Sequence, residues 1–191
     1  PDQHLGRNTA KRKGLTGPDI LLFDPLLPWG GHTPEAIRRA RVILWAGHCH
    51  VHMNFKPEHV LARRAEFADI TIVVHPECRE EVVDLADVVG STNTIVSTVE
   101  KAPKGATIAI GTELNLVARL IAEHPDKRIL PLSGDNCPMC VNMFRTSLND
   151  LAYTLGTLEA GGAFEVKVAE PQKTQARLAL DRMLELSGGP K

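Results

Sequence analysis

Cysteine, histidine and glutamate residues gather in a few short motifs of this chain, and these residue types suggest metal or acid–base chemistry. The segment His48-Cys49-His50-Val51-His52 carries four side chains that can bind a metal. In an extended chain alternate side chains share a face, so the three histidines would point one way and Cys49 the other. The segment predicts a zinc-type ligand set, a single thiolate beside uninvolved histidines, or a histidine-rich loop without metal.

A second thiol motif is Cys137-Pro138-Met139-Cys140. A Cys-x-x-Cys pair is typical of half a zinc site or of a redox pair, and it also arises by chance. The motif lies late in the chain, whereas a thioredoxin-like protein carries it after its first strand. A structural zinc site would need a second ligand pair, which only the region around Cys49 can supply.

Three further motifs combine polar side chains with chain turns. His75-Pro76-Glu77-Cys78 offers an acid–base pair at a strand end, or simply a polar strand end. Gly90-Ser91-Thr92 favours a carboxylate or phosphate nest before a helix, or plain helix capping. Gly111-Thr112-Glu113 indicates a strand-to-helix turn in which Glu113 stabilises the helix dipole rather than catalysing a reaction.

Alternating apolar runs and helical patterns predict the elements that position these motifs. We expect strands at residues 20–23, 42–45, 70–75, 88–89, 107–110, 128–132 and 164–169. We expect helices at residues 34–40, 57–67, 79–86, 113–123, 140–158 and 172–186, with another after the Gly90 motif. This alternation predicts an α/β fold with parallel sheets, in which ligands bind beyond the carboxyl ends of the strands. Six notable residues lie at such ends: Cys49, His75, Glu77, Ser91, Glu113 and Cys140.

Composition narrows the function classes. The 191 residues include 22 Lys and Arg against 23 Asp and Glu, so no basic surface favours nucleic acid or an anionic membrane. The longest apolar runs, 42–46 and 70–74, are far shorter than a membrane span. Four cysteines are too few for a disulfide scaffold. The sequence also lacks the glycine-rich dinucleotide motif, the phosphate-binding P-loop and the His-Glu-x-x-His zinc motif.

The order and spacing of the motifs resemble the quinolinate synthase family. The family's PD-x-x-LG, G-x-C-x-VH and VHPEC segments resemble residues 1–6, 47–52 and 74–78. Its GST and GTE segments match residues 90–92 and 111–113. Its C-x-x-M-x-x-x-T-L segment begins at Cys140, with Ser147 where threonine is usual. The resemblance runs nearly from end to end of the chain.

The resemblance implies a fold of repeated three-layer αβα subdomains with short parallel sheets, arranged with pseudo-threefold symmetry around a central cavity. It implies condensation of iminoaspartate with dihydroxyacetone phosphate to quinolinate, in NAD biosynthesis, with a [4Fe–4S] cluster that has one open iron. Cys49 and Cys140 would be two of its three cysteine ligands, with Cys137 as a further candidate. Glu77 and His75 would be catalytic and bind substrate, and Ser91 and Thr92 would hold a carboxylate or the phosphate.

The resemblance also predicts which parts of the family's fold the chain carries. Residues 1–52 would end the middle subdomain, residues 53–168 would form the third, and the helix within 169–191 would pack on a first subdomain outside this sequence. We therefore expect a C-terminal portion, inactive alone, of a cytoplasmic transferase. L-aspartate oxidase, which supplies iminoaspartate, is the suggested protein partner.

Two other readings of the residues stay open at this point. One is a zinc-binding α/β module or metallohydrolase that uses Cys49, His52, Cys137 and Cys140. The other is an α/β domain without catalysis that only binds partners. The metal that the cysteines hold would separate the three readings, because an iron–sulfur protein is brown and a zinc protein is colourless.

Overall fold

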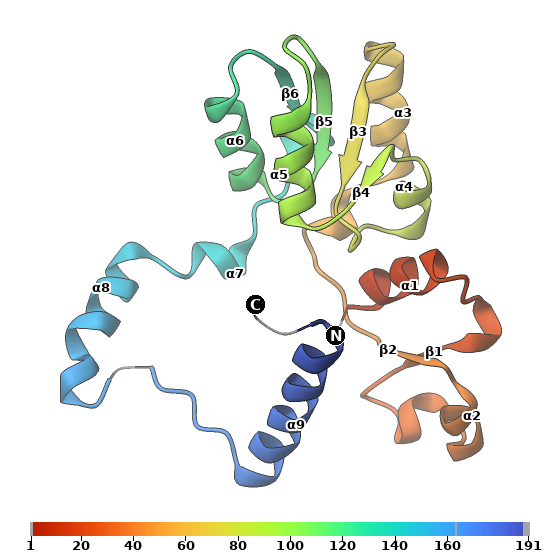
Figure 1. Ribbon diagram of the computed structural model, residues 1–191, viewed down its shortest axis with the longest axis vertical. Coiled ribbons are helices and arrows are strands. Elements are labelled where there is room, and N and C mark those ends of the chain that lie inside the picture. Colours follow the sequence, from red (N-terminus) through yellow and green to blue (C-terminus); the bar gives the residue numbers. More distant parts are fainter. Residues whose placement is uncertain (1, 163, 189–191) are drawn as a thin grey trace. The chain divides into compact units, whose positions relative to one another are not determined.

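The computed structural model describes residues 2–162 and 164–188, and it has the α/β fold with short parallel sheets that the sequence predicts (Figure 1). The chain divides into two compact units, Pro1–Phe144 and Arg145–Lys191. The first unit contains both sheets and every motif cysteine. The expected subdomain boundaries after residues 52 and 168 stay predictions.

A two-stranded parallel sheet lies near the start of the first unit. Strands β1 (Ile20–Phe23) and β2 (Val42–Trp45) pair from Ile20 opposite Val42 to Phe23 opposite Trp45. Between them lie a 3-10 turn, Pro28–Gly31, and helix α2 (Pro34–Arg39). The start of α2 follows from the sequence, because the Thr33 side chain caps the helix and proline fits its first position.

Helix α1 (Gln3–Arg12) precedes this sheet and was not expected from the sequence. Its side chains are mostly polar, so it lacks the apolar stripe by which surface helices are recognised. Asp2 caps the helix by accepting hydrogen bonds from the backbone N–H groups of His4 and Leu5, at 2.9 and 2.8 Å. Contacts with another part of the chain stabilise the helix. Asn8 is buried, and its amide donates to the carbonyls of Pro76 and Cys78 at 2.8 and 2.9 Å.

A four-stranded parallel sheet, with strand order β4-β3-β5-β6, forms the centre of the first unit. Its strands are β3 (Thr71–Val74), β4 (Val88–Val89), β5 (Thr107–Gly111) and β6 (Arg128–Pro131). Helices α3 (Pro57–Glu66), α4 (Glu80–Asp84), α5 (Thr92–Lys101) and α6 (Leu114–Glu123) lie between and beside them (Figure 1). The chain runs strand, helix, strand throughout, as a parallel sheet requires.

Both faces of this sheet are buried, because successive side chains of each strand point to opposite layers. Ile72 and Val74 belong to a core that includes Val60 of α3 and Val82 of α4. Val73, between them, belongs to a second core. That core is completed by residues of α5, β5, α6 and β6: Ile95, Val99, Ile108, Ile110, Val117, Leu120 and Ile129. The result is a three-layer αβα arrangement around β3 and β5.

The remaining segments differ from the sequence expectation. The predicted helix over 140–158 is wrong as one element: it forms α7 (Val141–Phe144) and α8 (Leu148–Thr157). The break has a local cause, because Ser147 and Asp150 form a capping box that starts a new helix. Short 3-10 turns also occur at Gly17–Asp19, His52–Asn54, Gly134–Asn136 and Leu158–Ala160.

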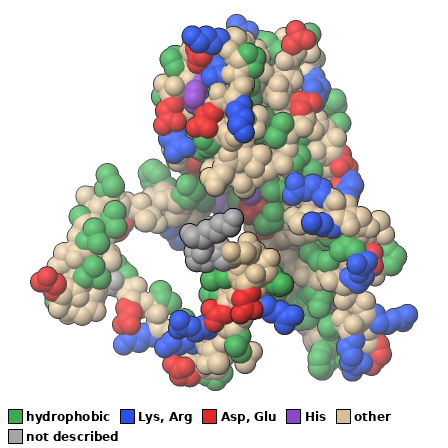
Figure 2. Space-filling model, viewed as in Figure 1, with side chains coloured by type: hydrophobic (Ala, Val, Ile, Leu, Met, Phe, Trp, Pro, Cys, Tyr) green, Lys and Arg blue, Asp and Glu red, His purple; other side chains and the backbone are tan. Residues whose placement is uncertain are grey.

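The predicted strand over 164–169 is also wrong. No described residue pairs with this segment, and an apolar run needs a partner strand to become part of a sheet. Its apolar side chains, Phe164, Val166 and Val168, are 72, 84 and 53% exposed. Helix α9 (Glu170–Leu186) follows as predicted, with Leu178, Met183 and Leu186 also exposed. Figure 2 shows exposed hydrophobic side chains along α8 as well.

Within the described residues, none of the helices is long and apolar enough to cross a membrane. Residues 1, 163 and 189–191 lie outside the described part of the chain, so the end of the predicted 169–191 segment is not described.

One side chain satisfies a backbone N–H group of strand β3 in the central sheet. The Asp87 carboxylate accepts a hydrogen bond from the buried Ile72 N–H at 2.7 Å and another from Arg64 at 2.9 Å. We expect Asp87→Ala to lower the free energy of unfolding by about 1–2 kcal/mol, because it leaves that strand donor unpaired. Asp84→Ala is the matched control: Asp84 meets Lys11 only in an exposed ion pair, so the loss should stay below about 1 kcal/mol. Urea unfolding measures the free energy of unfolding of both variants. Equal losses would contradict the role of Asp87 as the acceptor that the strand requires.

Candidate functional site

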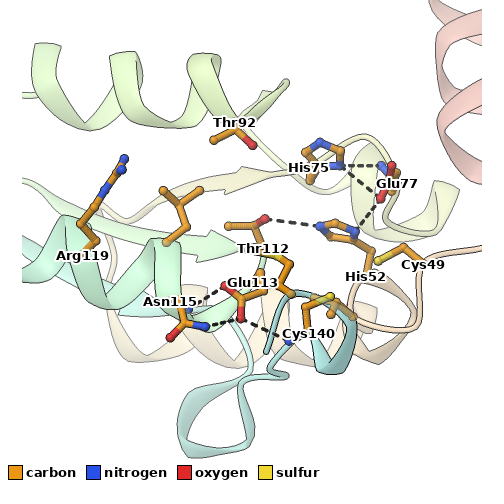
Figure 3. Close-up of a pocket in the computed structure, with 13 residues that line it drawn as sticks. Cys49, His52, His75, Glu77, Thr92, Thr112, Glu113, Asn115, Arg119 and Cys140 are labelled. Carbon is orange, nitrogen blue, oxygen red and sulfur yellow. Dashed lines mark hydrogen bonds and ion pairs between the residues drawn. The ribbon is translucent and has the colours of Figure 1, made fainter. Parts of the chain in front are cut away.

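The motif residues meet at the carboxyl end of the four-stranded sheet, around a cavity of about 540 Å³ (Figure 3). Its lining comes from segments that are far apart in the chain. Cys49 and His52 follow β2, His75 and Glu77 follow β3, Thr92 starts α5, and Thr112 follows β5. Cys140 reaches the cavity from the loop beyond β6. Parallel strands bring these ends together because all four carboxyl ends lie on one edge.

His52 is the central polar side chain of the cavity, and it is only 7% exposed. Its Nδ1 lies 2.9 Å from Oε2 of Glu77, and its Nε2 lies 3.3 Å from the Thr112 hydroxyl. Its ring stacks on the His75 ring with centroids 4.6 Å apart. Burial lowers the pKa of His52 to about 4, and the neighbouring His75 adds to the effect. His52 is therefore a neutral imidazole at neutral pH.

His75 and Glu77, which the sequence suggested as an acid–base pair, lie close together in the turn after β3, with His75 Nδ1 3.9 Å from Glu77 Oε2. The Glu77 backbone N–H donates to His75 Nδ1 at 3.3 Å, so the proton of a neutral His75 ring lies on Nε2. Burial lowers the pKa of His75. Burial also raises the pKa of Glu77, and the negative charge of Asp2 adds to that rise. Both shifts favour the uncharged forms of the two groups.

Cys49 and His52 lie on the same side of the chain, contrary to the expected alternation. The segment is not extended: it turns after Cys49 and enters the 3-10 turn His52–Asn54. The ligand atoms of Cys49, His52 and Glu77 consequently lie within 4.8 Å of one another, a group that could hold a metal ion. Burial raises the pKa of the Cys49 thiol.

Cys140 lines this cavity together with Cys49, and the two cysteines also line a smaller neighbouring cavity of about 290 Å³. Cys137 points elsewhere: its thiol donates to the carbonyl of Thr112 at 3.7 Å, and burial raises its pKa. Among the described residues, the metal-capable group includes neither Cys137 nor Cys140. The four ligands of the zinc hypothesis thus do not form one mononuclear group.

The two hydroxyl residues of the Gly90 motif are placed differently. Both residues are exposed. Thr92 lines the cavity at the start of α5, whereas Ser91 is outside the lining and its hydroxyl lies 3.4 Å from that of Thr94. Gly90 is required by space here, because a Cβ at this position would overlap the Thr94 side chain. The motif therefore brings the helix start, rather than both hydroxyls, to the cavity.

Sequence reasoning missed several residues of the site. Thr112, Asn115, Leu116, Arg119 and Met143 line the cavity but were not expected there. Arg119, whose Nε lies 3.6 Å from Glu123, supplies a permanent positive charge. The sequence alone did not indicate that Arg119 and Asn115 belong to the site. Polar side chains on a helix can face either a site or solvent, and the packing of the helix decides which. His52 was expected only as a zinc ligand, although its place in the Val-His motif was a usable signal.

Comparison with known proteins agrees with the motif order. A family model described as quinolinate synthetase A protein matches residues 1–185. The chain belongs to the quinolinate synthetase A family. Curated quinolinate synthases from Herpetosiphon aurantiacus and Nocardioides sp. are 47 and 50% identical to it, and one from Bacillus subtilis is 46% identical. Each comparison covers 98% of this chain and 50, 48 and 50% of the respective relative. The chain spans about half the length of these curated relatives.

Burial gives the cysteines different expected reactivities. Cys78 is fully buried, its thiol faces the Gly111 carbonyl at 3.8 Å, and burial raises its pKa strongly. Cys49, Cys137 and Cys140 are only partly buried. In the metal-free native protein we expect Cys78 to react with iodoacetamide roughly 100-fold more slowly than Cys49 or Cys140. Peptide mapping by mass spectrometry measures this, with urea-denatured protein as the control. Equal native labelling would mean that the β3 turn opens readily.

Proposed function

We propose that this chain forms part of a quinolinate synthase, which condenses iminoaspartate with dihydroxyacetone phosphate to quinolinate in de novo NAD biosynthesis. The observation that carries the proposal is the meeting of Cys49, Cys140, His75 and Glu77 at one cavity. The curated relatives named quinolinate synthase support it. Because the chain spans about half of their length, the activity is proposed for the complete protein.

The thiols of this site suit two of the three cysteine ligands of a [4Fe–4S] cluster with one open iron. Cys49 and Cys140 would hold it, because their thiols line the same two cavities and are only partly buried. A metal displaces the proton of each cysteine thiol that it binds, which is the usual behaviour of metal-binding cysteines. An open iron in such a cluster supplies a Lewis acid that polarises a substrate oxygen.

Glu77 is the proposed acid–base residue. Tautomerisation and loss of water both require a group that accepts a proton from carbon or nitrogen and returns one to oxygen. A carboxyl whose pKa is raised by burial exchanges protons more readily near neutral pH than an exposed carboxylate does. Glu77 Oε2 lies 2.9 Å from His52 Nδ1, which places the carboxyl group beside the buried imidazole.

The other polar groups would bind and orient the two substrates. His75 would donate from Nε2, since its Nδ1 accepts the Glu77 backbone N–H. Thr92 and the free backbone N–H groups at the start of α5 suit a carboxylate or phosphate. Ser91 is a second candidate for binding the carboxylate or phosphate. Its position next to Thr92 supports this role, although its side chain lies outside the cavity lining.

A cytoplasmic location and L-aspartate oxidase as a partner complete the proposal. Iron–sulfur thiolates need a reducing compartment, which supports the cytoplasm. Iminoaspartate hydrolyses readily in water, which favours an enzyme that delivers it close to its site of use.

The ligand set is tested by serine variants of the complete protein, purified without oxygen. We expect Cys49→Ser and Cys140→Ser to lose most of their iron, sulfide and brown colour, because each removes a thiolate ligand. Cys137→Ser is the matched control and should keep them, because its thiol faces the Thr112 carbonyl. Retention of iron by the first two variants would contradict the proposal. Zinc in place of iron would instead favour the metallohydrolase alternative.

The role of Glu77 is tested by an isosteric change that removes only its proton exchange. Glu77→Gln should lower turnover roughly 100-fold or more, because that is the usual effect of losing a general acid–base group. The visible iron–sulfur absorbance should stay unchanged. Glu58→Gln, on the exposed face of α3, is the matched control and should turn over normally. Normal turnover by Glu77→Gln would remove Glu77 from the mechanism.

A further inference from the structure

The two cavity cysteines share a feature that the other cysteines lack. The backbone N–H of Cys49 donates to Oδ2 of Asp2 at 2.9 Å, and that of Cys140 donates to Oε1 of Glu113 at 3.2 Å. Cys78 donates instead to the carbonyl of His75. Among residues 2–162 and 164–188, carboxylates accept the backbone N–H of Cys49 and Cys140 and of neither other cysteine.

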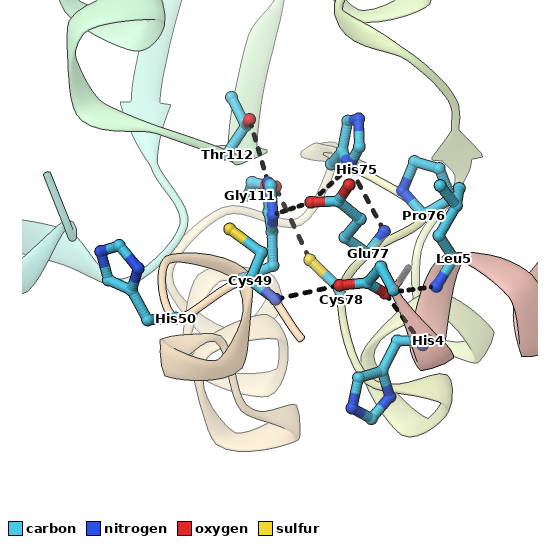
Figure 4. Close-up of polar contacts among 12 residues, drawn as sticks. His4, Leu5, Cys49, His50, His75, Pro76, Glu77, Cys78, Gly111 and Thr112 are labelled. Atoms are coloured by element: carbon cyan, nitrogen blue, oxygen red, sulfur yellow. Dashed lines mark hydrogen bonds and ion pairs between the residues drawn. The ribbon is translucent and has the colours of Figure 1, made fainter. Parts of the chain in front are cut away.

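Figure 4 labels His4, Leu5 and Cys49, three residues whose backbone N–H groups donate to Asp2. Asp2 thereby connects Cys49 to the start of α1. Its two oxygens have separate tasks: Oδ1 accepts the His4 and Leu5 N–H groups, and Oδ2 accepts the Cys49 N–H. A backbone hydrogen bond of 2.9 Å from Gln3 to the Gly47 carbonyl ties the same two segments. One side chain thus caps a helix and fixes the turn that carries a thiol, across 47 positions of sequence.

Glu113 does the same for Cys140 at the start of α6 (Figure 3). Its Oε2 accepts the Asn115 N–H at 2.8 Å, which caps the helix. Its Oε1 accepts both the Asn115 side-chain amide, at 2.8 Å, and the Cys140 N–H. Glu113 is only 7% exposed. The Leu114 N–H also donates to the Pro138 carbonyl at 3.3 Å, so the loop before Cys140 is held at two points.

The negative charge of Asp2 and Glu113 does not explain why these carboxylates lie beside the two cysteines. A negative group beside a thiol disfavours the thiolate, so neither side chain can activate its cysteine for metal binding by charge. What each can do is fix a backbone. Cys49 and Cys140 both lie in loops outside helices and strands, where individual hydrogen bonds set the direction of the Cα–Cβ bond. The carbonyl of each accepts a backbone N–H four residues on, and the carboxylate fixes the N–H of the same residue. A carboxylate is a strong acceptor for a backbone N–H, and each of these two acceptors is itself anchored to a helix.

We propose that Asp2 and Glu113 are positioning residues that aim the Cys49 and Cys140 thiols at a shared metal group. The inference rests on the proposed function, in which these two thiols hold the cluster. It adds that one device serves both: a helix-capping carboxylate that uses one oxygen for the helix and the other for the cysteine backbone. Residues that orient metal ligands in this way commonly change metal affinity 10- to 100-fold when altered.

Amide variants separate the two tasks of each carboxylate. In Asp2→Asn the remaining carbonyl oxygen can still cap α1, because asparagine is a good N-cap residue. Its NH2 group then faces the Cys49 N–H, and two donors cannot bond. Glu113→Gln has the same effect at Cys140. Glu35→Gln is the matched control: it removes one charge from the first turn of α2, where Glu35 meets only the exposed Arg38.

The experiment uses the complete protein, reconstituted with iron and sulfide without oxygen and then exposed to an iron chelator. We expect Asp2→Asn and Glu113→Gln to lose iron roughly 10-fold faster than wild type, and the double variant faster still. Glu35→Gln should match wild type. Circular dichroism and thermal unfolding check that the helices remain. If either amide variant unfolds, Asp2→Ser or Glu113→Ser replaces it, since serine caps a helix but is too short to reach the cysteine.

A second readout needs no metal. In the metal-free protein, Asp2→Asn should change the alkylation rate of Cys49 alone, and Glu113→Gln that of Cys140 alone. A general loss of stability would instead change both rates together and would overturn the positioning role, as would wild-type iron retention by both variants. The serine variants of Cys49 and Cys140 distinguish the two levels of failure. If they keep iron, the proposed function fails; if they lose iron while the amide variants keep it, only the positioning role fails.

Discussion

Burial of β3 and β5 on both faces is the constraint on which the rest of the first unit depends. Val73 packs toward α5 and α6 while its neighbours Ile72 and Val74 pack toward α3 and α4, so these helices are held in place by alternate residues of a single strand. A strand buried on both sides cannot shift by one residue without exchanging its two sets of neighbours. The register of β3 therefore fixes where the chain leaves the sheet, and His75 and Glu77 are the residues found there.

Burial at this position shifts three titratable groups of the site toward their uncharged forms. Loops beyond buried strands are themselves half-buried, and desolvation disfavours the charged forms of His52, His75 and Glu77 alike. A cavity lined by neutral imidazoles and a carboxyl of raised pKa suits proton transfer. It also suits thiols that give up their protons to a metal. Asp2 and Glu113 have a different role, because their carboxylates accept hydrogen bonds from backbone N–H groups at helix starts.

Much of the fold was predictable because its elements have local causes. The strands of the central sheet read as short β-branched runs that end at proline, glycine or a polar turn, and the structure has them within a residue or two. Helix α2 was predictable from Thr33 and Pro34. The two wrong predictions also have physical causes. The capping box at Ser147 divides a helix whose apolar pattern continues through it, and residues 164–169 have β-type composition but no strand to pair with among the described residues.

The sequence by itself determined the motifs, the α/β class and the family. These depend only on the order and spacing of residues, which can be read without knowing where the side chains lie in space. The tertiary structure decided which motif residues meet. It placed His52 with Cys49, contrary to the alternation of an extended chain, because the segment turns instead of extending. It turned Cys137 toward Thr112 and brought Cys140 to the cavity. It also joined Asp2 to Cys49 across 47 positions, and the physical reason is that such a hydrogen bond depends on how α1 packs against the rest of the unit.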